Sequence, residues 1–478
     1  MVRVESCYRV LGSGYDLCCS GCLHWGVKFM NDFSVDGKKV VVLGLARSGE
    51  AAARLLYDLG ASVTVNEYKE KQELQNAEEL ESLGISFVTG GHPLSLLEPR
   101  PLFVVKNPGI RYDNPLVKRA IEAEIPVITE IELAAQVVEG TMIAITGSNG
   151  KTTTTELITR MISEDGKQAE VAGNIGRPAS EVARTIDKDG FMVTEVSSFQ
   201  LKGTLHFKPK IALMLNIFDA HLDYHGTKED YVNSKTRITT EQTEEDFFVY
   251  NADDPIVVRA AEKSRATKVP FSVERPLNSG AYYMNDNIYW QDTVIMKRAD
   301  AALPGIHNLE NILAAVAAAK LSGVSDRAIA HVLNVFTGVE HRLQYVKTLQ
   351  GRKVFNDSKA TNVLATEKAL QAFKEPVVLI AGGLDRGNEF DGLMSSMENV
   401  KALISYGETK HKLKSTADAA GVQTTEVTNT LDEAVATAFR ASNIGDVILL
   451  SPACASWDQY RTFEERGEAF IRAIGAIE

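Results

Sequence analysis

The stretch MIAITGSNGKTT, residues 142–153, decides the fold of this chain. Four apolar residues lead into a glycine-rich run that ends in Gly-Lys-Thr, which is the order of a buried strand, an anion-binding loop and a helix start. The usual phosphate-loop pattern, G-x-x-x-x-G-K-[ST], would need a glycine where this chain has Ile145. The loop is too short for that pattern, so its context must decide whether it binds a nucleotide.

The short loop keeps the features that phosphate binding requires. Gly147 and Gly150 let the main chain approach phosphate oxygens, Lys151 supplies positive charge, and the Thr152 hydroxyl is a ligand suited to Mg²⁺. The alternative, a serine- and glycine-rich helix cap, rarely holds Gly-Lys-Thr-Thr in this register. We therefore predict a nucleotide site formed by Gly147, Ser148, Asn149, Gly150, Lys151, Thr152 and Thr153.

Composition excludes several classes of protein. The chain has 478 residues, 44% hydrophobic and 24% charged, enough for several domains with their own cores. Its 51 Lys and Arg against 63 Asp and Glu give a net charge of -12, which argues against nucleic acid or an anionic membrane as partner. Because no run reaches the ~20 apolar residues of a membrane span, we expect a soluble cytoplasmic protein without membrane insertion.

Four of the five cysteines lie within the first 22 residues. Cys19 and Cys22 form a C-x-x-C pair, but no second spaced pair follows to complete a structural zinc site. We expect residues 1–29 to be an unstructured leader, with Met30 opening the part of the chain that folds. Cys454 is expected to be a buried residue at a strand end, not a nucleophile.

Three successive α/β units follow the leader. KKVVVLGL, ARSGEAAARLLYDLG and ASVTVNE predict a strand, a crossover helix and a second strand from Lys38 to Glu67, with the turn Gly44–Gly49 after the first strand. PLFVVKNPGI predicts another strand that ends in a turn. A second unit contains the glycine loop and the strands TMIAI, FMVTEVS and IALMLNI, with a small β-rich insertion predicted between Phe247 and Ala301. RKVFND, VVLIAGG, VKALISYG and DVILLSPA predict a third, parallel sheet.

Two further groups of residues strengthen the prediction of a site. Glu195 ends an apolar strand, where a carboxylate could bind the metal of a nucleotide. Asp219, His221, Asp223 and His225 cluster after the next strand, in a chain with nine histidines. A lone histidine is more often structural than functional, but four ionisable groups within seven residues favour a site.

Nine motifs, taken in order, resemble those of the Mur ligase family, in which the short phosphate loop is usual. They are TGSNGKTT, GNIG, EVSSFQL, DAHLDYHG, NSKTR, GIHNLEN, GVEHRLQ, NDSKATN and SPACASWDQY. The resemblance spans Val40 to the C-terminus. It implies an α/β fold of three domains: a Rossmann-like N-terminal domain, a central P-loop ATPase-like domain and a C-terminal Rossmann-like domain. The predicted division is a disordered leader at 1–36, then a UDP-binding domain at 37–129, an ATP-binding domain at 130–338 and an amino-acid- and ATP-binding domain at 339–478.

The resemblance also implies a reaction. NDSKATN, SPACAS and the chain length are most similar to family members that join D-glutamate to UDP-N-acetylmuramoyl-L-alanine with ATP, through an acyl phosphate, in peptidoglycan precursor synthesis. We expect the protein to bind those two substrates together with ATP and two Mg²⁺ ions. We also expect it to be a monomer. By resemblance, the catalytic residues are Lys151, Asn174, His221 and Lys235, and the metal ligands are Thr152, Glu195, His221 and Lys235. Lys235 is expected to be carbamylated, because an ammonium cannot bind a cation and a carbamate oxygen can.

Other binding residues follow from the same resemblance. Beyond the glycine loop, the nucleotide is expected to contact Asn308, Arg342 and Asp357. The D-glutamate residues are expected to be Lys359, Thr361, Arg386, Ser456 and Phe463, where Arg386 stands in place of a common lysine. The UDP residues are expected to be Leu45, Ala46, Arg47, Ser48, Glu67, Tyr68, Asn107 and Gly109, where Glu67 replaces a common aspartate.

Three alternatives remain open at this point. A sibling ligase with another acceptor, such as L-alanine or a folate, would share the central domain. A nucleotide switch would use the loop alone, although no guanine-reading N-K-x-D element is found. A nicotinamide oxidoreductase could use the turn Gly44–Gly49 alone.

Overall fold

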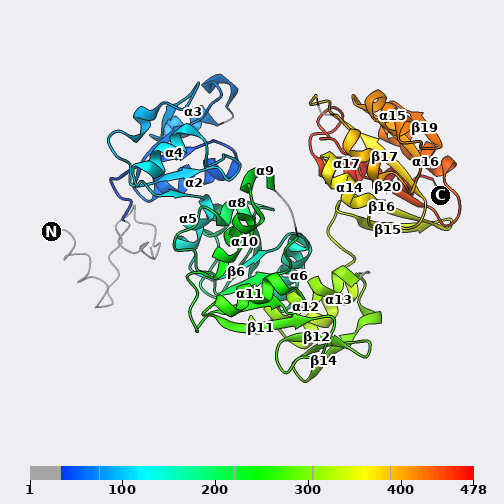
Figure 1. Cartoon of the computed structure of the whole chain (residues 1–478), viewed down its shortest axis with the longest axis horizontal. Coiled ribbons are helices and arrows are strands. Elements are labelled where there is room, and N and C mark those ends of the chain that lie inside the picture. The colour runs from blue at the N-terminus through cyan, green and yellow to red at the C-terminus, as the bar shows by residue number, and fades with distance from the viewer. Residues whose placement is uncertain (1–33, 75, 219–221, 304–305, 388, 478) are drawn as a thin grey trace. The chain divides into compact units, whose positions relative to one another are not determined.

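The computed structural model describes residues 34–74, 76–218, 222–303, 306–387 and 389–477. The cysteine-rich segment 1–29 therefore lies outside the described residues, as do Asp219 and His221, and only residues 34–36 of the leader predicted at 1–36 are described. The described chain forms three sheets, of five, nine and six strands (Figure 1). It divides into two compact units: the first holds the N-terminal sheet and Ala172–Lys210, and the second holds the loop after β6 and the C-terminal sheet.

The first sheet has the strand order β3-β2-β1-β4-β5, and all its pairs are parallel. Val40 to Leu43 have no exposed surface, as expected for the central strand of a parallel sheet. Its elements are β1 Lys39–Leu43, α2 Arg47–Asp58, β2 Ser62–Asn66, η1 Lys71–Glu73, α3 Ala77–Ser82, β3 Ser86–Val88, η2 Leu94–Leu97, β4 Val104–Lys106, α4 Pro115–Glu122 and β5 Val127–Ile128, and α5 Glu130–Val137 follows it.

The second sheet has the order β14-β13-β12-β11-β10-β9-β6-β8-β7. Its first half comprises β6 Thr141–Thr146, α6 Lys151–Glu164, β7 Ala169–Gly173, α7 Ala179–Val182, β8 Phe191–Glu195, α8 Ser198–Leu201, β9 Ile211–Met214, α9 Leu222–His225, α10 Lys228–Thr236 and η3 Arg237–Thr239. Its second half comprises β10 Phe247–Asn251, α11 Pro255–Lys263, β11 Thr267–Ser272, β12 Ala281–Met284, β13 Asn287–Trp290, β14 Thr293–Lys297, η4 Arg298–Asp300, α12 Ile306–Leu321 and α13 Asp326–Val335.

The third sheet has the order β15-β16-β20-β17-β18-β19. Figure 1 shows helices on its faces, as a doubly wound sheet requires. Its elements are β15 Gln344–Leu349, β16 Arg352–Asn356, α14 Val363–Leu370, β17 Val377–Gly382, η5 Asp391–Ser396, β18 Val400–Tyr406, α15 Lys410–Ala419, β19 Thr424–Val427, α16 Leu431–Ala441, β20 Val447–Leu450 and α17 Phe463–Gly475.

The strands expected from apolar runs are all present, but two expectations need correction. FFVYN is β10, which pairs in parallel with β9 and β11, so it belongs to the main central sheet and not to an insertion. The antiparallel ladder β12–β14 extends that same sheet. In the third sheet β15 pairs antiparallel with β16, so this sheet is mixed. An edge strand joined by a tight hairpin has no helix to mark it in the sequence.

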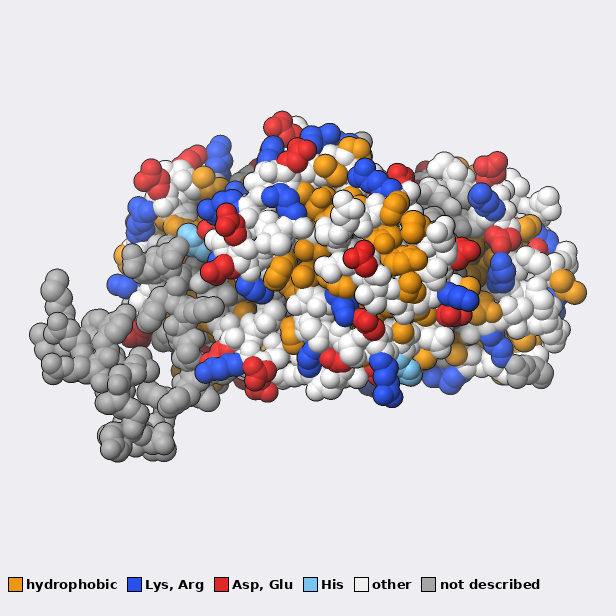
Figure 2. All heavy atoms as spheres, turned by 90° about the horizontal axis from the view of Figure 1, so that it is seen from below, with side chains coloured by type: hydrophobic (Ala, Val, Ile, Leu, Met, Phe, Trp, Pro, Cys, Tyr) orange, Lys and Arg blue, Asp and Glu red, His pale blue; other side chains and the backbone are white. Residues whose placement is uncertain are grey.

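Among the described residues, no helix is long and apolar enough to cross a membrane. The face drawn in Figure 2 carries basic and acidic side chains interspersed, without a continuous basic area. The predicted domain boundaries at 37, 130 and 339 stay predictions.

Candidate active site

The loop after β6 is held in shape by Asn216, which follows β9. The main-chain nitrogen of Asn149 donates to Asn216 Oδ1 at 2.9 Å, and that of Ser148 donates to Asn216 O at 2.9 Å. Gly147 and Gly150 have φ of 154° and 84°, values that favour glycine. Sequence reasoning missed Asn216, because nothing local in the sequence marks a brace that lies 67 residues from the loop.

Lys151 is the first residue of α6, and its ammonium folds back over the loop. Lys151 Nζ donates to Gly147 O at 2.8 Å and to Ser148 O at 3.1 Å. The amides at the start of α6 and this ammonium favour an anion at the helix N-terminus. Thr152 is buried and Thr153 is half-buried beside it.

A second residue that sequence reasoning missed is Asn311 on α12, which is 5% exposed. Asn311 Nδ2 donates to the predicted nucleotide ligand Asn308 at Oδ1, 3.2 Å away. Asn311 Oδ1 accepts a long hydrogen bond, 3.5 Å, from Thr154 on α6. The motif GIHNLEN thus supplies two asparagines, one half-exposed and one packed under the glycine loop.

Glu195 and Asn174 lie together in the first compact unit. Glu195, 2% exposed at the end of β8, accepts a hydrogen bond of 2.7 Å at Oε1 from Asn174 Nδ2. The main-chain nitrogen of Asn174 donates to Glu195 O at 2.9 Å. A buried carboxylate at a strand end offers the hard oxygen ligands that Mg²⁺ takes.

The helix α10 carries Lys235, which is 2% exposed and whose Nζ lies 4.8 Å from the centre of the Tyr231 ring. An amine is not a magnesium ligand, so Lys235 fits a metal site only as a carbamate. Among the described residues, no group of three or more His, Cys, Asp or Glu side chains is arranged to hold a metal. Thr152 and Glu195 supply oxygen donors that fit Mg²⁺, and His221 lies outside the described residues.

His225, the other histidine of the cluster, is part of a hydrogen-bonded chain. His225 Nδ1 lies 2.6 Å from Asp230 Oδ2, and Nε2 lies 3.0 Å from Ser198 Oγ. Burial lowers the pKa of His225 more than Asp230 raises it. The neutral ring therefore donates from Nδ1 to Asp230 and accepts from Ser198. Burial alone would raise the pKa of Asp230, but hydrogen bonds from Lys202 and His225 hold it below its usual range.

The predicted UDP residues gather at the carboxyl ends of β1, β2 and β4. The nitrogen of Leu45 donates to Glu67 Oε2 at 2.8 Å, and that of Tyr68 donates to Glu67 Oε1 at 2.8 Å. Asn107 Nδ2 donates to Ser48 Oγ at 3.3 Å. Glu67 thus braces the turn with its own carboxylate oxygens, one residue past the end of β2.

The remaining predicted UDP residues occupy the same edge. Ala46 precedes α2, and Arg47 Nη1 donates to Gly176 O at 3.4 Å. Gly109 N donates to Asn107 Oδ1 at 3.1 Å, which closes the turn after β4. Tyr68 is 72% exposed, so its ring is available to a ligand.

In the C-terminal sheet, Asp357 follows β16 and is 6% exposed. Burial raises the pKa of Asp357 to about 6. Hydrogen bonds donated by Ser451 Oγ at 2.9 Å and by Leu343 N at 3.0 Å act in the opposite direction and lower this pKa. The exposed Arg342 also lowers that pKa. Asp357 is therefore a buried carboxylate that ionises just below neutral pH.

Among the predicted D-glutamate residues, Lys359 pairs with Phe463, and Arg386 pairs with a residue outside the predicted set. Lys359 Nζ lies 4.8 Å from the ring centre of Phe463, and the nitrogen of Thr361 donates to Lys359 O at 2.9 Å. The Arg386 guanidinium lies 4.6 Å from the ring centre of Trp457, which is 63% exposed and follows the buried Ser456. Trp457 was not predicted from the sequence.

Arg466 on α17, which was not predicted from the sequence, connects the loop of Ser358 with the loop of Cys454. It is fully buried and donates to Ser358 Oγ at 2.9 Å, Ser358 O at 2.8 Å and Cys454 O at 3.0 Å. Cys454 is 4% exposed, and burial raises its pKa to about 11. That agrees with the predicted inert, buried thiol, because a nucleophilic cysteine needs a lowered pKa.

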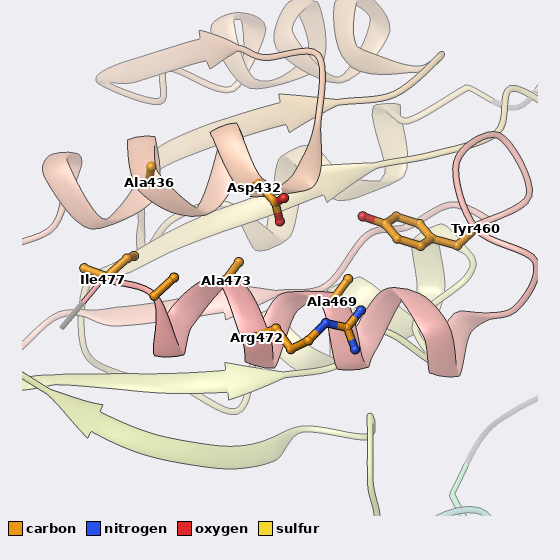
Figure 3. A pocket seen from close by; sticks show the side chains of 8 residues that line it. Asp432, Ala436, Tyr460, Ala469, Arg472, Ala473 and Ile477 are labelled. Atoms are coloured by element: carbon orange, nitrogen blue, oxygen red, sulfur yellow. The ribbon is translucent and has the colours of Figure 1, made fainter.

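A hollow of about 600 Å³ lies between α16 and α17 (Figure 3). Asp432 and Ala436 on α16 face Ala469, Arg472 and Ala473 on α17, and Tyr460 lies to one side. None of the predicted site residues is among the described residues that line it. The candidate site is thus a set of loop surfaces at strand ends and not this hollow.

These features define the class: an α/β protein with a glycine loop after a strand of its central sheet and two further sheets, one parallel and one mixed. The chain belongs to the Mur ligase family. Residues 38–129 match the MurD-like N-terminal domain of Mur ligases, residues 145–319 the Mur ligase middle domain, and residues 341–454 the Mur ligase glutamate ligase domain.

Individual relatives agree with this assignment. The UDP-N-acetylmuramoylalanine--D-glutamate ligase of Geobacillus sp. (strain WCH70) is 56% identical over 438 residues, covering 91% of this chain and 97% of the relative. The enzyme of that name from Halalkalibacterium halodurans is 55% identical over 441 residues, covering 92% and 98%. The solved structure of UDP-N-acetylmuramate-alanine ligase MurC from Thermotoga maritima has a TM-score of 0.53 at 18% identity, covering 92% of this chain and 100% of that one, which shows a shared fold.

Proposed function

We propose that this protein is the ATP-dependent ligase that adds D-glutamate to UDP-N-acetylmuramoyl-L-alanine in peptidoglycan precursor synthesis. The observation that carries the proposal is identity of 54–57% to D-glutamate ligases across at least 91% of this chain. At that identity the N-terminal and C-terminal sheets are shared as well as the phosphate loop, which argues against a simple nucleotide switch. We also propose a cytoplasmic location, which the use of ATP and a UDP-linked precursor supports.

Two steps account for the reaction. A carboxylate oxygen of the UDP-linked substrate attacks the γ-phosphorus of ATP, and ADP leaves. The neutral amine of D-glutamate then attacks the acyl carbon of the acyl phosphate, phosphate leaves, and the amine proton passes to solvent. Each reactant is anionic, so positive charge placed between the reacting groups lowers the activation barriers of phosphoryl transfer and of amine attack.

The residues of this chain divide that work. Lys151 and the amides at the start of α6 bind the phosphates, supported by Asn308 from α12. Asn174 orients the substrate carboxylate that receives the phosphoryl group. The hydrogen bond from Asn174 to Glu195 holds the asparagine in place for this role. Mg²⁺ held by Thr152 and Glu195 would neutralise phosphate charge, and a second ion would be held by His221 and carbamylated Lys235. The burial of Lys235, which is 2% exposed, supports a role inside the site rather than at the protein surface.

Substrate recognition involves the other two sheets. The N-terminal turns, with Glu67 and Asn107 as braces, would bind the UDP part. Arg342 and Asp357 would contact the nucleotide. Lys359 and Arg386 supply the charge that the two carboxylates of D-glutamate require, with Thr361, Ser456 and Phe463 beside them. A monomeric state stays a prediction.

The test is ADP release from the purified protein with a panel of UDP-linked precursors and D- and L-amino acids. We expect release only when UDP-N-acetylmuramoyl-L-alanine and D-glutamate are both present. Equal release with UDP-N-acetylmuramate and L-alanine would reassign the enzyme within the family. Lys151→Ala should abolish turnover, and a fully active variant would refute the role given to the loop.

A further inference from the structure

Lys106, the last residue of β4, is 1% exposed. Its ammonium donates hydrogen bonds to main-chain carbonyl oxygens of the turn that follows β4. Its Nζ lies 2.9 Å from Ile110 O and 3.3 Å from Pro108 O. It also lies 3.2 Å from the hydroxyl of Tyr224. A buried ammonium thus joins the turn 107–110 to a residue 118 positions away.

Tyr224 belongs to α9, in the histidine-rich segment that carries His221 and His225. Its hydroxyl lies 3.2 Å from both Pro108 O and Ile110 O. The hydroxyl accepts from Lys106 and donates its single proton to one of these carbonyls. Lys106, Tyr224 and the two carbonyl groups therefore form a closed set of hydrogen bonds, here called the clasp.

The clasp lies in an environment that is costly for a lysine. Burial lowers the pKa of Lys106 to about 7, and the nearby Lys202 ammonium adds to the effect. The Tyr112 ring offsets part of this cost, since Lys106 Nζ lies 4.6 Å and Lys202 Nζ 5.1 Å from its centre. A buried structural position of this kind is filled more readily by an apolar side chain, so the presence of a lysine here points to a role.

Each end of the clasp continues toward a predicted binding region. On one side Asn107 bonds Ser48 and Gly109, which fixes the turn against the predicted UDP loop. On the other side the Tyr224 ring packs 4.4 Å from Phe199, centre to centre, and 5.1 Å from His225.

From His225 the contacts run on to Lys235. The His225 ring lies 5.4 Å from Tyr231, and the Tyr231 ring lies under Lys235 Nζ. His225 is also bonded to Asp230 on α10. The clasp thus connects the predicted UDP-binding turn to α10, the helix that carries the predicted metal ligand Lys235.

We propose that Lys106 and Tyr224 are positioning residues that couple binding of the UDP-linked substrate to binding of the magnesium nucleotide. The proposal rests on the proposed function for the identity of both ligands. A substrate that orders the turn 107–110 also orders α9 and α10, and with them the groups that hold the metal. By reciprocity, magnesium nucleotide then tightens binding of the UDP-linked substrate.

Tyr224→Phe is the sharpest variant, because it removes one hydroxyl and keeps the ring contacts with Phe199 and His225. Tyr112→Phe is its matched control, since the Tyr112 hydroxyl has no hydrogen-bond partner among the described residues although its ring faces the same lysine. Lys106→Met keeps the length of the stem and removes the charge. The double variant Lys106→Met with Tyr224→Phe tests whether the two residues act as one unit.

The measurement is the dissociation constant of UDP-N-acetylmuramoyl-L-alanine by titration calorimetry, with and without Mg²⁺ and a non-hydrolysable ATP analogue. The ratio of the two constants is the coupling factor. We expect Tyr224→Phe to reduce the coupling factor roughly five-fold, the effect of one hydrogen bond, and Lys106→Met to reduce it about ten-fold or more, as for charged hydrogen bonds. The double variant should be no worse than Lys106→Met, and Tyr112→Phe should match the wild type.

A merely structural role would weaken both dissociation constants alike and leave their ratio unchanged, and that result would overturn the proposal. A wild-type coupling factor of one would overturn it too. Failure of the proposed function gives a different result, namely wild-type protein that binds and couples both ligands but releases no ADP with D-glutamate.

Discussion

Gly150 faces the side-chain amide of Asn311 so closely that a Cβ at residue 150 would lie 2.1 Å from Asn311 Oδ1. Its φ of 84° also lies in the left-handed region. Asn311 is buried and bonded to Asn308 and Thr154, so it cannot move aside without breaking contacts on both α12 and α6. The path of the glycine loop is therefore set by packing against α12 as well as by its own backbone.

Gly150→Ala should reduce ATP turnover at least a hundred-fold, because the loop must shift away from Asn311. Gly166→Ala is the matched control: its φ is 79° but nothing lies within 4 Å of the added carbon. The control should lose about 1 kcal/mol of stability to backbone strain and keep its activity. Steady-state ADP release and thermal unfolding check both variants, and equal activity of the two would refute the packing argument.

Asp357→Asn should stabilise the protein above pH 6. The carboxyl has a pKa of about 6 in the folded chain against 3.8 when exposed, so the folded state favours the protonated form. That contribution is fully present below pH 4 and is lost as pH rises through 6, where the buried carboxylate is charged. Each pKa unit corresponds to about 1.4 kcal/mol, so we expect a gain on the order of 2 kcal/mol at pH 8 that shrinks toward pH 5.

The same variant should bind nucleotide more weakly, since a side-chain amide has one acceptor oxygen where the carboxylate has two. Urea unfolding at pH 5 and pH 8 gives the stability difference, and calorimetry gives the affinity for ATP. A stability difference that is independent of pH would show that Asp357 does not titrate as described.

Arg466→Met should destabilise the C-terminal sheet strongly. The guanidinium makes three hydrogen bonds to Ser358 and Cys454, and it is completely buried. Its removal leaves two buried carbonyl oxygens without a donor, a loss of about 3 kcal/mol or more. Arg440→Met is a control on α16, where the guanidinium bonds only Thr437 among the contacts described. Similar unfolding midpoints for the two variants would contradict this account.

Arg386→Lys should raise the KM for D-glutamate about five-fold and leave the KM for the UDP-linked substrate unchanged. The planar guanidinium stacks on Trp457, and an ammonium loses both that plane and the paired donors that suit a carboxylate. Arg352→Lys is the matched control, because that guanidinium also lies 4.6 Å from a ring centre, that of Phe439. A change in the KM for D-glutamate in both variants would argue against a specific role for Arg386.

Activity should depend on dissolved CO₂ if Lys235 is carbamylated. Protein degassed at low pH and assayed without bicarbonate should lose most of its activity, and bicarbonate should restore it. Lys235→Arg keeps the positive charge but cannot form a carbamate, so it should stay inactive with or without bicarbonate. Full activity of Lys235→Arg would rule out the proposed metal ligand.

Much of the candidate site was predictable because it follows strands. Lys151 and Glu195 lie at the carboxyl ends of the neighbouring strands β6 and β8, after the glycine loop and at the strand end respectively, and Asp357 follows β16 in the C-terminal sheet. Trp457 could have been suspected, since an exposed tryptophan beside Ser456 in a loop at a strand end suits a ligand. Asn216, Asn311 and Arg466 could not, because polar residues on or near helices are common and only their partners distinguish them.

The sequence by itself determined the three α/β units, the place of the phosphate loop and the family, because apolar periodicity and short motifs are local properties of the chain. The tertiary structure alone decided how those motifs are held. Asn216 braces a loop 67 residues earlier, and Lys106 meets Tyr224 across 118 residues. Such contacts depend on which strands become neighbours, and that is settled by burial of the whole core rather than by any one segment.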